Sequence, residues 1–142
     1  MAQAVFRAIN QARADNSRSA LTWCNALANS ARQHDFAMQK AHTLSHQLPG
    51  EAELGARENQ QGIIWSWAGE NIGETTLLTV NGALSLHQAM MSEQPPDDGH
   101  RQNILNTNFN LVGVDVLIDR TNGLLWLTED FAGMGQTLSL AQ

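Results

Sequence analysis

Apolar residues recur at helical spacing in three long segments of the chain. Residues 2–14, 23–40 and 76–92 each carry an apolar stripe with steps of about three or four positions. The apolar residues are Val5, Ala8, Ile9 and Ala12; Ala28, Ala31 and Met38; and Val80, Leu84 and Met91, with His87 on the same stripe as the last three. Thr22 precedes the second segment and is a suitable N-terminal cap for it. The pattern therefore predicts three long helices, with a shorter helical candidate over residues 51–59.

Other runs predict strands. Residues 63–68 form a short apolar run that is typical of a buried strand. Residues 111–118 alternate valines with other residues, and residues 124–131 form a second strand candidate. Asn122-Gly123 lies between these two and favours a tight turn. The chain is therefore predicted to end in an antiparallel hairpin.

The order of these elements indicates the fold class. Helices come first and the hairpin last, which favours an α+β domain built in layers over alternating βαβ units. The chain has 142 residues, 42% of them hydrophobic. That length suits one compact domain with one core and is too short for two ordinary domains. We expect a single domain over residues 1–142.

Charge and cysteine content exclude several classes of function. Fourteen acidic residues against eight basic ones give a net charge of −6, with no basic cluster. A nucleic-acid ligand is therefore disfavoured. No apolar run approaches the roughly 20 residues of a membrane-spanning helix. Cys24 is the single cysteine, so the fold is expected to stand without an intramolecular disulfide.

Dispersed histidines and carboxylates carry the candidate chemistry, because the common nucleophile, metalloprotease and phosphate-loop motifs are absent. His46, Glu70 and His100 occupy loop-like positions 24 (70 − 46) and 30 (100 − 70) residues apart. This spacing permits them to converge. Two imidazoles and a carboxylate would suit Zn²⁺ or a similar divalent ion. The same groups would also form an acid/base pair without a metal, or a purely structural hydrogen-bonded pair.

The remaining titratable candidates are interpreted as structural. His42 and His46 are four positions apart, but their surroundings are not typical of a helix, so we do not predict a metal-binding pair there. His34 and His87 fall within predicted helices, which indicates surface or core-edge positions. Glu129 shares one face of the last strand with apolar residues. It is therefore expected near a cavity or at the sheet edge.

A series of short motifs recurs along nearly the whole chain. In order they are Ile9-Asn10-x-x-Arg13, Leu21-Thr22-Trp23, Ala31-x-x-His34, Ser45-His46, Gly69-Glu70-Asn71-Ile72, Gly99-His100-Arg101-x-Asn103-Ile104-Leu105, Val112-Gly113-Val114 and Leu127-Thr128-Glu129-Asp130-Phe131. Together they resemble the CAP superfamily (cysteine-rich secretory proteins, antigen 5 and pathogenesis-related 1), also called SCP-like, in its compact bacterial form. The resemblance covers about residues 5–133.

The resemblance implies an α-β-α sandwich in which a central antiparallel sheet lies between helical layers. It also implies an open cleft that holds two histidines and two acidic residues. By position, His46, Glu70 and His100 match three of the four. The fourth belongs near the end of the preceding helix, where Glu93 is the preferred candidate and Ser92 an alternative one position earlier; Glu129 is the second choice.

The family is linked to several activities, so the resemblance implies alternatives rather than one reaction. We expect a ligand-binding module whose cleft takes a divalent metal, Zn²⁺ or Mg²⁺, through His46 and His100 with Glu70. A metal-assisted hydrolase using the same cleft is the alternative, and sterol or fatty-acid binding between helices is a third. The ligand would be a small molecule, peptide or lipid, and the protein a monomer. Because the family is largely secreted, a secreted or periplasmic location is expected, although Met1–Phe6 lacks the features of a signal peptide.

Overall fold

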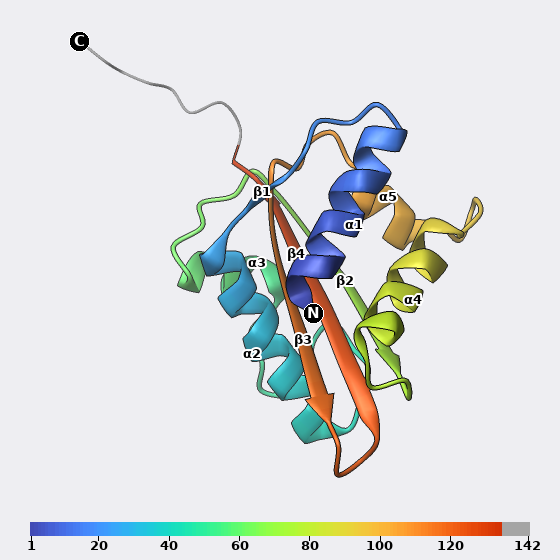
Figure 1. Ribbon diagram of the computed structural model, residues 1–142. Helices are drawn as coiled ribbons and strands as arrows, with labels where there is room; N and C mark the ends of the chain where they lie inside the picture. Colours follow the sequence, from blue (N-terminus) through green and yellow to red (C-terminus); the bar gives the residue numbers. More distant parts are fainter. Residues whose placement is uncertain (135–142) are drawn as a thin grey trace.

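The computed structural model describes residues 1–134 as five helices and four strands (Figure 1). The predicted domain boundary at residue 142 lies outside the described residues. The elements are α1 (Ala2–Asp15), β1 (Thr22–Trp23), α2 (Asn25–Ala41), α3 (Leu54–Gln60), β2 (Trp67–Thr75), α4 (Val80–Met91), α5 (Gly99–Leu105), β3 (Leu111–Asp119) and β4 (Leu124–Gly133).

The strands form one sheet in the order β1-β3-β4-β2. The predicted hairpin is β3–β4, and β2 runs antiparallel along the other edge of β4 from Trp67↔Gly133 to Thr75↔Leu125. The two-residue strand β1 pairs with β3 in parallel. Strand β4 has a neighbour on both edges, and nine of its ten residues are buried. It is the centre of the fold.

Helices cover both faces of the sheet. Helices α1, α4 and α5 lie together on one face, and α2 packs with α3 on the other (Figure 1). The larger apolar cluster lies under the first group and includes Val5, Ile9, Val114 and Phe131. A smaller cluster of Met38, Leu48, Ile72 and Trp126 lies on the α2 side. The predicted α+β class and three-layer α-β-α arrangement are confirmed.

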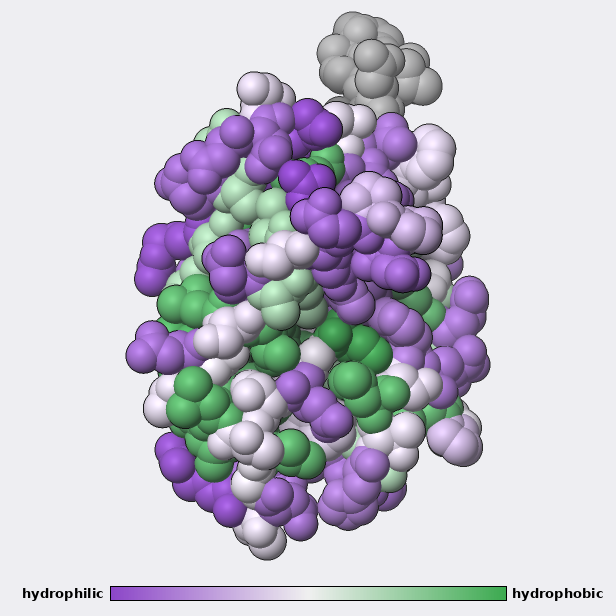
Figure 2. Space-filling view, turned by 90° about the vertical axis from the view of Figure 1, so that its right-hand side faces the viewer, coloured by the Kyte–Doolittle hydropathy of each residue, from purple (hydrophilic) through white to green (hydrophobic). Residues whose placement is uncertain are grey.

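The outer surface is mixed in polarity. Figure 2 shows the face that is turned to the right in Figure 1, where α4 and α5 lie: polar side chains cover much of its upper part and its lower rim, and the most apolar ones gather across the middle and lower left. Leu77 and Val80, just before and at the start of α4, are among the exposed large apolar residues. Among residues 1–134, no helix is long and apolar enough to cross a membrane.

Two local predictions are wrong. Residues 63–66 do not form a strand, and β2 begins only at Trp67. Ile63 is buried in a small cluster, while the Trp65 indole donates a hydrogen bond to the Gly55 carbonyl of α3. The apolar run is therefore used to pack the α3–β2 connection. Thr22 does not cap α2: it is paired with β3, and Cys24 occupies the N-cap position.

Helix α3 carries a carboxyl group into the interior. Glu58 is fully buried, and within the described part of the chain neither of its carboxylate oxygens has a hydrogen-bond partner. Burial raises the pKa of Glu58 to about 9, with a further contribution from the nearby carboxylates of Asp130 and Glu70. A charge there would be costly to bury. Glu58 is therefore neutral at pH 7.

The contact between β3 and α2 should tolerate no side chain at Gly113. A Cβ at this position would overlap the backbone of Leu27 and Ala28. Because backbone cannot move aside as a side chain does, we expect Gly113→Ala to lower the free energy of unfolding by about 1–3 kcal/mol. Urea denaturation measures the loss. Gly99→Ala is the control, since its Cβ would meet nothing within 4 Å; an equal loss in both variants would contradict the argument.

Glu58 should make the fold less stable as the pH rises. The unfolded chain releases this proton near its ordinary pKa of 4.5, whereas the folded chain keeps it to about 9. Unfolding therefore releases a proton between these values, and each pH unit there costs the folded state up to about 1.4 kcal/mol. We expect Glu58→Gln to flatten the fall in unfolding free energy between about pH 5 and pH 8. The exposed Glu53→Gln variant should follow the wild-type curve; a Glu58→Gln curve parallel to wild type would refute the assignment.

Candidate functional site

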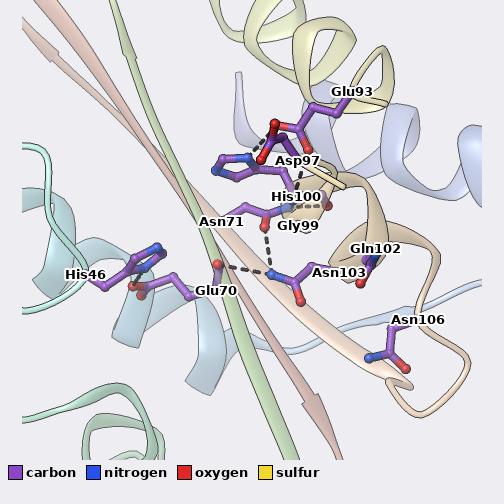
Figure 3. Close-up of a pocket in the computed structure, with 10 residues that line it drawn as sticks. All are labelled: His46, Glu70, Asn71, Glu93, Asp97, Gly99, His100, Gln102, Asn103 and Asn106. Carbon is purple, nitrogen blue, oxygen red and sulfur yellow. Dashed lines mark hydrogen bonds and ion pairs between the residues drawn. The ribbon is translucent and has the colours of Figure 1, made fainter. Parts of the chain in front are cut away.

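One edge of the sheet opens into a polar cleft of about 520 Å³ (Figure 3). Its walls come from the segment before α3, from β2, from the α4–α5 connection and from α5. The lining residues are His46, Glu70, Asn71, Glu93, Asp97, Gly99, His100, Gln102, Asn103 and Asn106. Four of the five predicted site residues are thus brought together, and the lining contains no large apolar side chain.

Strand β2 divides this cleft into two halves. Neighbouring side chains of a strand point to opposite faces of the sheet. Glu70 therefore points to the α2–α3 side, where it meets His46, and Asn71 points to the α5 side, near His100 (Figure 3). Each half holds one histidine paired with one glutamate.

In the first half of the cleft, the Glu70 carboxylate fixes the orientation of the His46 ring. His46 Nδ1 lies 2.9 Å from Glu70 Oε1, so this nitrogen carries the hydrogen and donates it to the carboxylate. The His46 side chain is 59% exposed, whereas that of Glu70 is 1% exposed. Partial burial and the nearby Arg57 lower the pKa of His46. The imidazole is therefore neutral at pH 7.

Arg57 anchors Glu70 from the interior. Its Nη2 donates to Glu70 Oε2 over 2.9 Å, and its Nη1 lies 3.5 Å from Asp130 Oδ2. All three side chains are almost completely buried. Burial raises the pKa of Glu70 even though Arg57 opposes the shift. Burial and the neighbouring Glu70 raise the pKa of Asp130 well above its ordinary value.

In the second half, Glu93 holds both the ring and the backbone of His100. Its Oε2 lies 2.6 Å from His100 Nδ1, and its Oε1 accepts hydrogen bonds from the backbone N–H groups of His100 and Arg101. These N–H groups belong to the first turn of α5, which has no partner for them within the helix. Glu93 is the acidic residue that the structure places beside His100.

Glu129 lies behind the cleft and does not line it. It is fully buried on β4 and accepts a hydrogen bond from Asn71 Nδ2, which also donates to the His100 carbonyl. Asn103 in turn donates to Asn71 Oδ1 and to the Glu70 carbonyl. Burial raises the pKa of Glu129 to about 7. Of the two expected positions, the sheet edge is wrong, because β4 has a neighbour on both sides; Glu129 lies near the cavity, one hydrogen bond behind it, and supports Asn71 from the core.

The other histidines stay outside the cleft. His34, predicted at the surface or core edge, is fully buried, with Nδ1 2.7 Å from Glu51 and Nε2 2.8 Å from the Ser45 carbonyl. This places it under the segment that carries His46. His87 is also buried, and His42 is exposed at the C-terminal end of α2. Within residues 1–134, no three His, Cys, Asp or Glu side chains form a group that could hold a metal ion.

Some site residues could not be singled out from the sequence. Asp97 comes from the proline-rich connection, and Gln102 and Asn106 from one side of α5 and its end. The four-residue spacing of Gln102 and Asn106 is the only signal that would have placed them together. Nothing in the sequence indicated the buried contacts of Arg57 with Glu70 and Asp130.

Solved structures share this fold. An extracellular protein containing an SCP domain from Bacillus anthracis matches with a TM-score of 0.77 and 26% identity, over 92% of this chain and 39% of that one. An outer surface protein from Borrelia burgdorferi matches with a TM-score of 0.78 and 16% identity, over 93% and 91%. A cysteine-rich secretory protein from Staphylococcus aureus matches with a TM-score of 0.70 and 18% identity, over 92% and 37%.

This chain therefore spans well under half of the B. anthracis and S. aureus chains that it matches. No curated protein sequence shows significant similarity to it. The model of the cysteine-rich secretory protein family matches residues 6–131, which include the four cleft residues His46, Glu70, Glu93 and His100. The motif series, the sandwich fold and this match agree, and the chain belongs to the cysteine-rich secretory protein family, CAP.

Proposed function

We propose that this domain is a ligand-binding module of an extracellular protein, and that its cleft takes a divalent cation through His46 and His100. The observation that carries the proposal is the matched pairing of the two imidazoles. Each has its Nδ1 occupied by a glutamate, at 2.9 Å for His46 and 2.6 Å for His100. Each therefore leaves Nε2 as the nitrogen available to a ligand. An extracellular setting is supported by the descriptions of the B. anthracis and B. burgdorferi proteins.

Two imidazole nitrogens suit a metal such as Zn²⁺, and because no third His, Cys, Asp or Glu of the described residues joins them in a metal-binding group, water would complete the coordination. Metal-binding imidazoles commonly donate their second nitrogen to a carboxylate, which fixes the ring and makes the free nitrogen a better ligand. Glu70 and Glu93 are placed for this orienting role rather than for direct binding. The lowered pKa of His46 keeps its lone pair available near pH 7. Bound there, a divalent cation would supply positive charge and positions for a polar ligand or water.

The lining of the cleft favours binding over the alternatives. Both glutamates already accept hydrogen bonds from imidazoles, so neither is free to act as the base of a metal-assisted hydrolase. Sterol or fatty-acid binding needs an apolar groove. The space between α1 and α4 has a volume of about 440 Å³, but its lining includes Gln11, Asp15, His87 and Gln88. A small polar or peptidic ligand in the His46–His100 cleft is better supported.

Zn²⁺ binding should depend on both imidazoles and on pH. Calorimetric titration at about pH 7.5 is expected to show saturable binding near one equivalent, and at about pH 5.5 binding should weaken because protons compete for the histidines. The His46→Ala/His100→Ala double variant should lose this binding without losing its fold, since both side chains are partly exposed.

The control is His42→Asn, which removes an exposed imidazole outside the cleft. Asparagine suits the left-handed backbone of residue 42, where φ is 51°. This variant should bind Zn²⁺ as wild type does. Unchanged affinity in the double variant, or an equal loss in His42→Asn, would exclude the cleft as the site.

Glutamine variants of Glu93 and Glu129 should differ in their Zn²⁺ affinity in the same titration. Glu93→Gln removes the charge that faces His100 Nδ1, so Zn²⁺ affinity is expected to fall about 10–100-fold. Glu129→Gln keeps an oxygen acceptor for Asn71 and replaces a group whose pKa of about 7 already leaves it partly neutral. Its affinity should change by less than about threefold. The reverse order would mean that the wrong carboxylate has been assigned to His100.

A further inference from the structure

A second, separate hollow lies at the opposite end of α5 from Glu93. It has a volume of about 250 Å³ and is lined by Arg13, Ser17, Arg18, Ser19, Ala20, Thr107, Phe109 and Asn110. Two of these residues are arginines, three carry hydroxyl groups and one carries an amide. No carboxylate lines the hollow within the described part of the chain. In a protein with a net charge of −6, this is an unusual concentration of hydrogen-bond donors.

The two guanidinium groups are held in place by backbone carbonyls. Arg13 Nε donates to the Ser19 carbonyl, and its Nη1 donates to the carbonyls of Ile104 and Asn106. Arg18 Nε donates to the Leu105 carbonyl, and its Nη1 donates to the Asn16 carbonyl. These bonds use Nε and Nη1 of both side chains and do not involve either Nη2. In each arginine, Nη2 takes part in none of these hydrogen bonds, while the rest of the guanidinium group is fixed by them.

Their charges are only partly balanced. Within residues 1–134, neither Arg13 nor Arg18 forms an ion pair with a carboxylate, in contrast to Arg57. The C-terminal end of α5 offers only the partial negative charge of a helix end. Arg13 is almost fully buried, and its pKa is lowered by burial and by the nearby Arg18. An anion between the two groups would stabilise both positive charges.

We propose that this hollow binds a small tetrahedral oxyanion, a phosphate or sulfate group, between Arg13 and Arg18. Guanidinium groups bind such oxygens through paired, charge-assisted hydrogen bonds. The hydroxyl groups of Ser17, Ser19 and Thr107 add neutral donors around them. The volume lies below the roughly 300–1,000 Å³ of drug-sized pockets, so the fitting ligand is an ion or a single anionic group. This site is independent of the proposed metal site.

The test is an NMR titration of the ¹⁵N-labelled protein with inorganic phosphate at low, constant ionic strength. Saturable shifts confined to residues 16–20 and 104–110 are expected. Arg18→Gln keeps an amide donor for the backbone carbonyls but removes the charge, and should weaken binding at least about tenfold, because hydrogen bonds from charged groups are stronger than those from neutral ones. Thr107→Val, which alters only a surface hydroxyl, should weaken it severalfold and covers the case in which Arg18→Gln does not fold.

Arg120→Gln is the matched control, because it removes the same charge from the exposed β3–β4 turn. It should leave the dissociation constant unchanged. Glycerol 3-phosphate and sulfate distinguish a phosphate ester from a free inorganic ion as the bound species, and either supports the proposal. Acetate binding as tightly as phosphate, shifts that do not saturate, or equal weakening in Arg120→Gln would each overturn it.

Discussion

The buried guanidinium of Arg57 is the contact on which the cleft depends. It touches Glu70 on β2 and Asp130 on β4, approaches Glu51, and donates to the His46 carbonyl. One side chain of a seven-residue helix thus joins two strands and the segment that carries His46. A charge so deep in the protein is tolerable only when it is paired and hydrogen-bonded. Removing Arg57 would leave its carboxylate partners buried without a cation.

Four acidic side chains are buried at or behind the cleft, and Arg57 forms ion pairs with only two of them, Glu70 and Asp130. Glu58, Glu70, Asp130 and Glu129 are all buried, and burial raises the pKa of each. Protons therefore supply part of the charge balance that one arginine cannot. In the cleft, by contrast, each glutamate is paired with an imidazole: Glu70 with His46 and Glu93 with His100. The interior sets the position of Glu70, and Glu70 sets the orientation of His46.

Much of this could be predicted from the sequence, for physical reasons that differ between elements. The hairpin was clear because two strand-like runs flank a turn segment, and Gly123 takes the positive φ of 69° in the four-residue connection between Asp119 and Leu124. His46, Glu70 and His100 stood out because the motif series fixed their order. Residues 63–66 were misjudged because an apolar run has the same composition whether it pairs with a strand or packs on α3. The position of Glu129 could not be narrowed further because alternation gives the face of a strand but not what covers that face.

Helix α5 links several of these features through its two ends. Glu93 accepts the free N–H groups at its start, and Arg13 and Arg18 bind the free carbonyls at its finish, so each terminus meets a charge that complements the helix dipole. A seven-residue helix has little stability of its own. Its length is therefore set by the two fixed anchors, about 10 Å apart. An insertion or deletion within α5 would turn one end by about 100° and detach it from its anchor. Length variation among related domains should accumulate in the connections on either side of α5 and spare the helix.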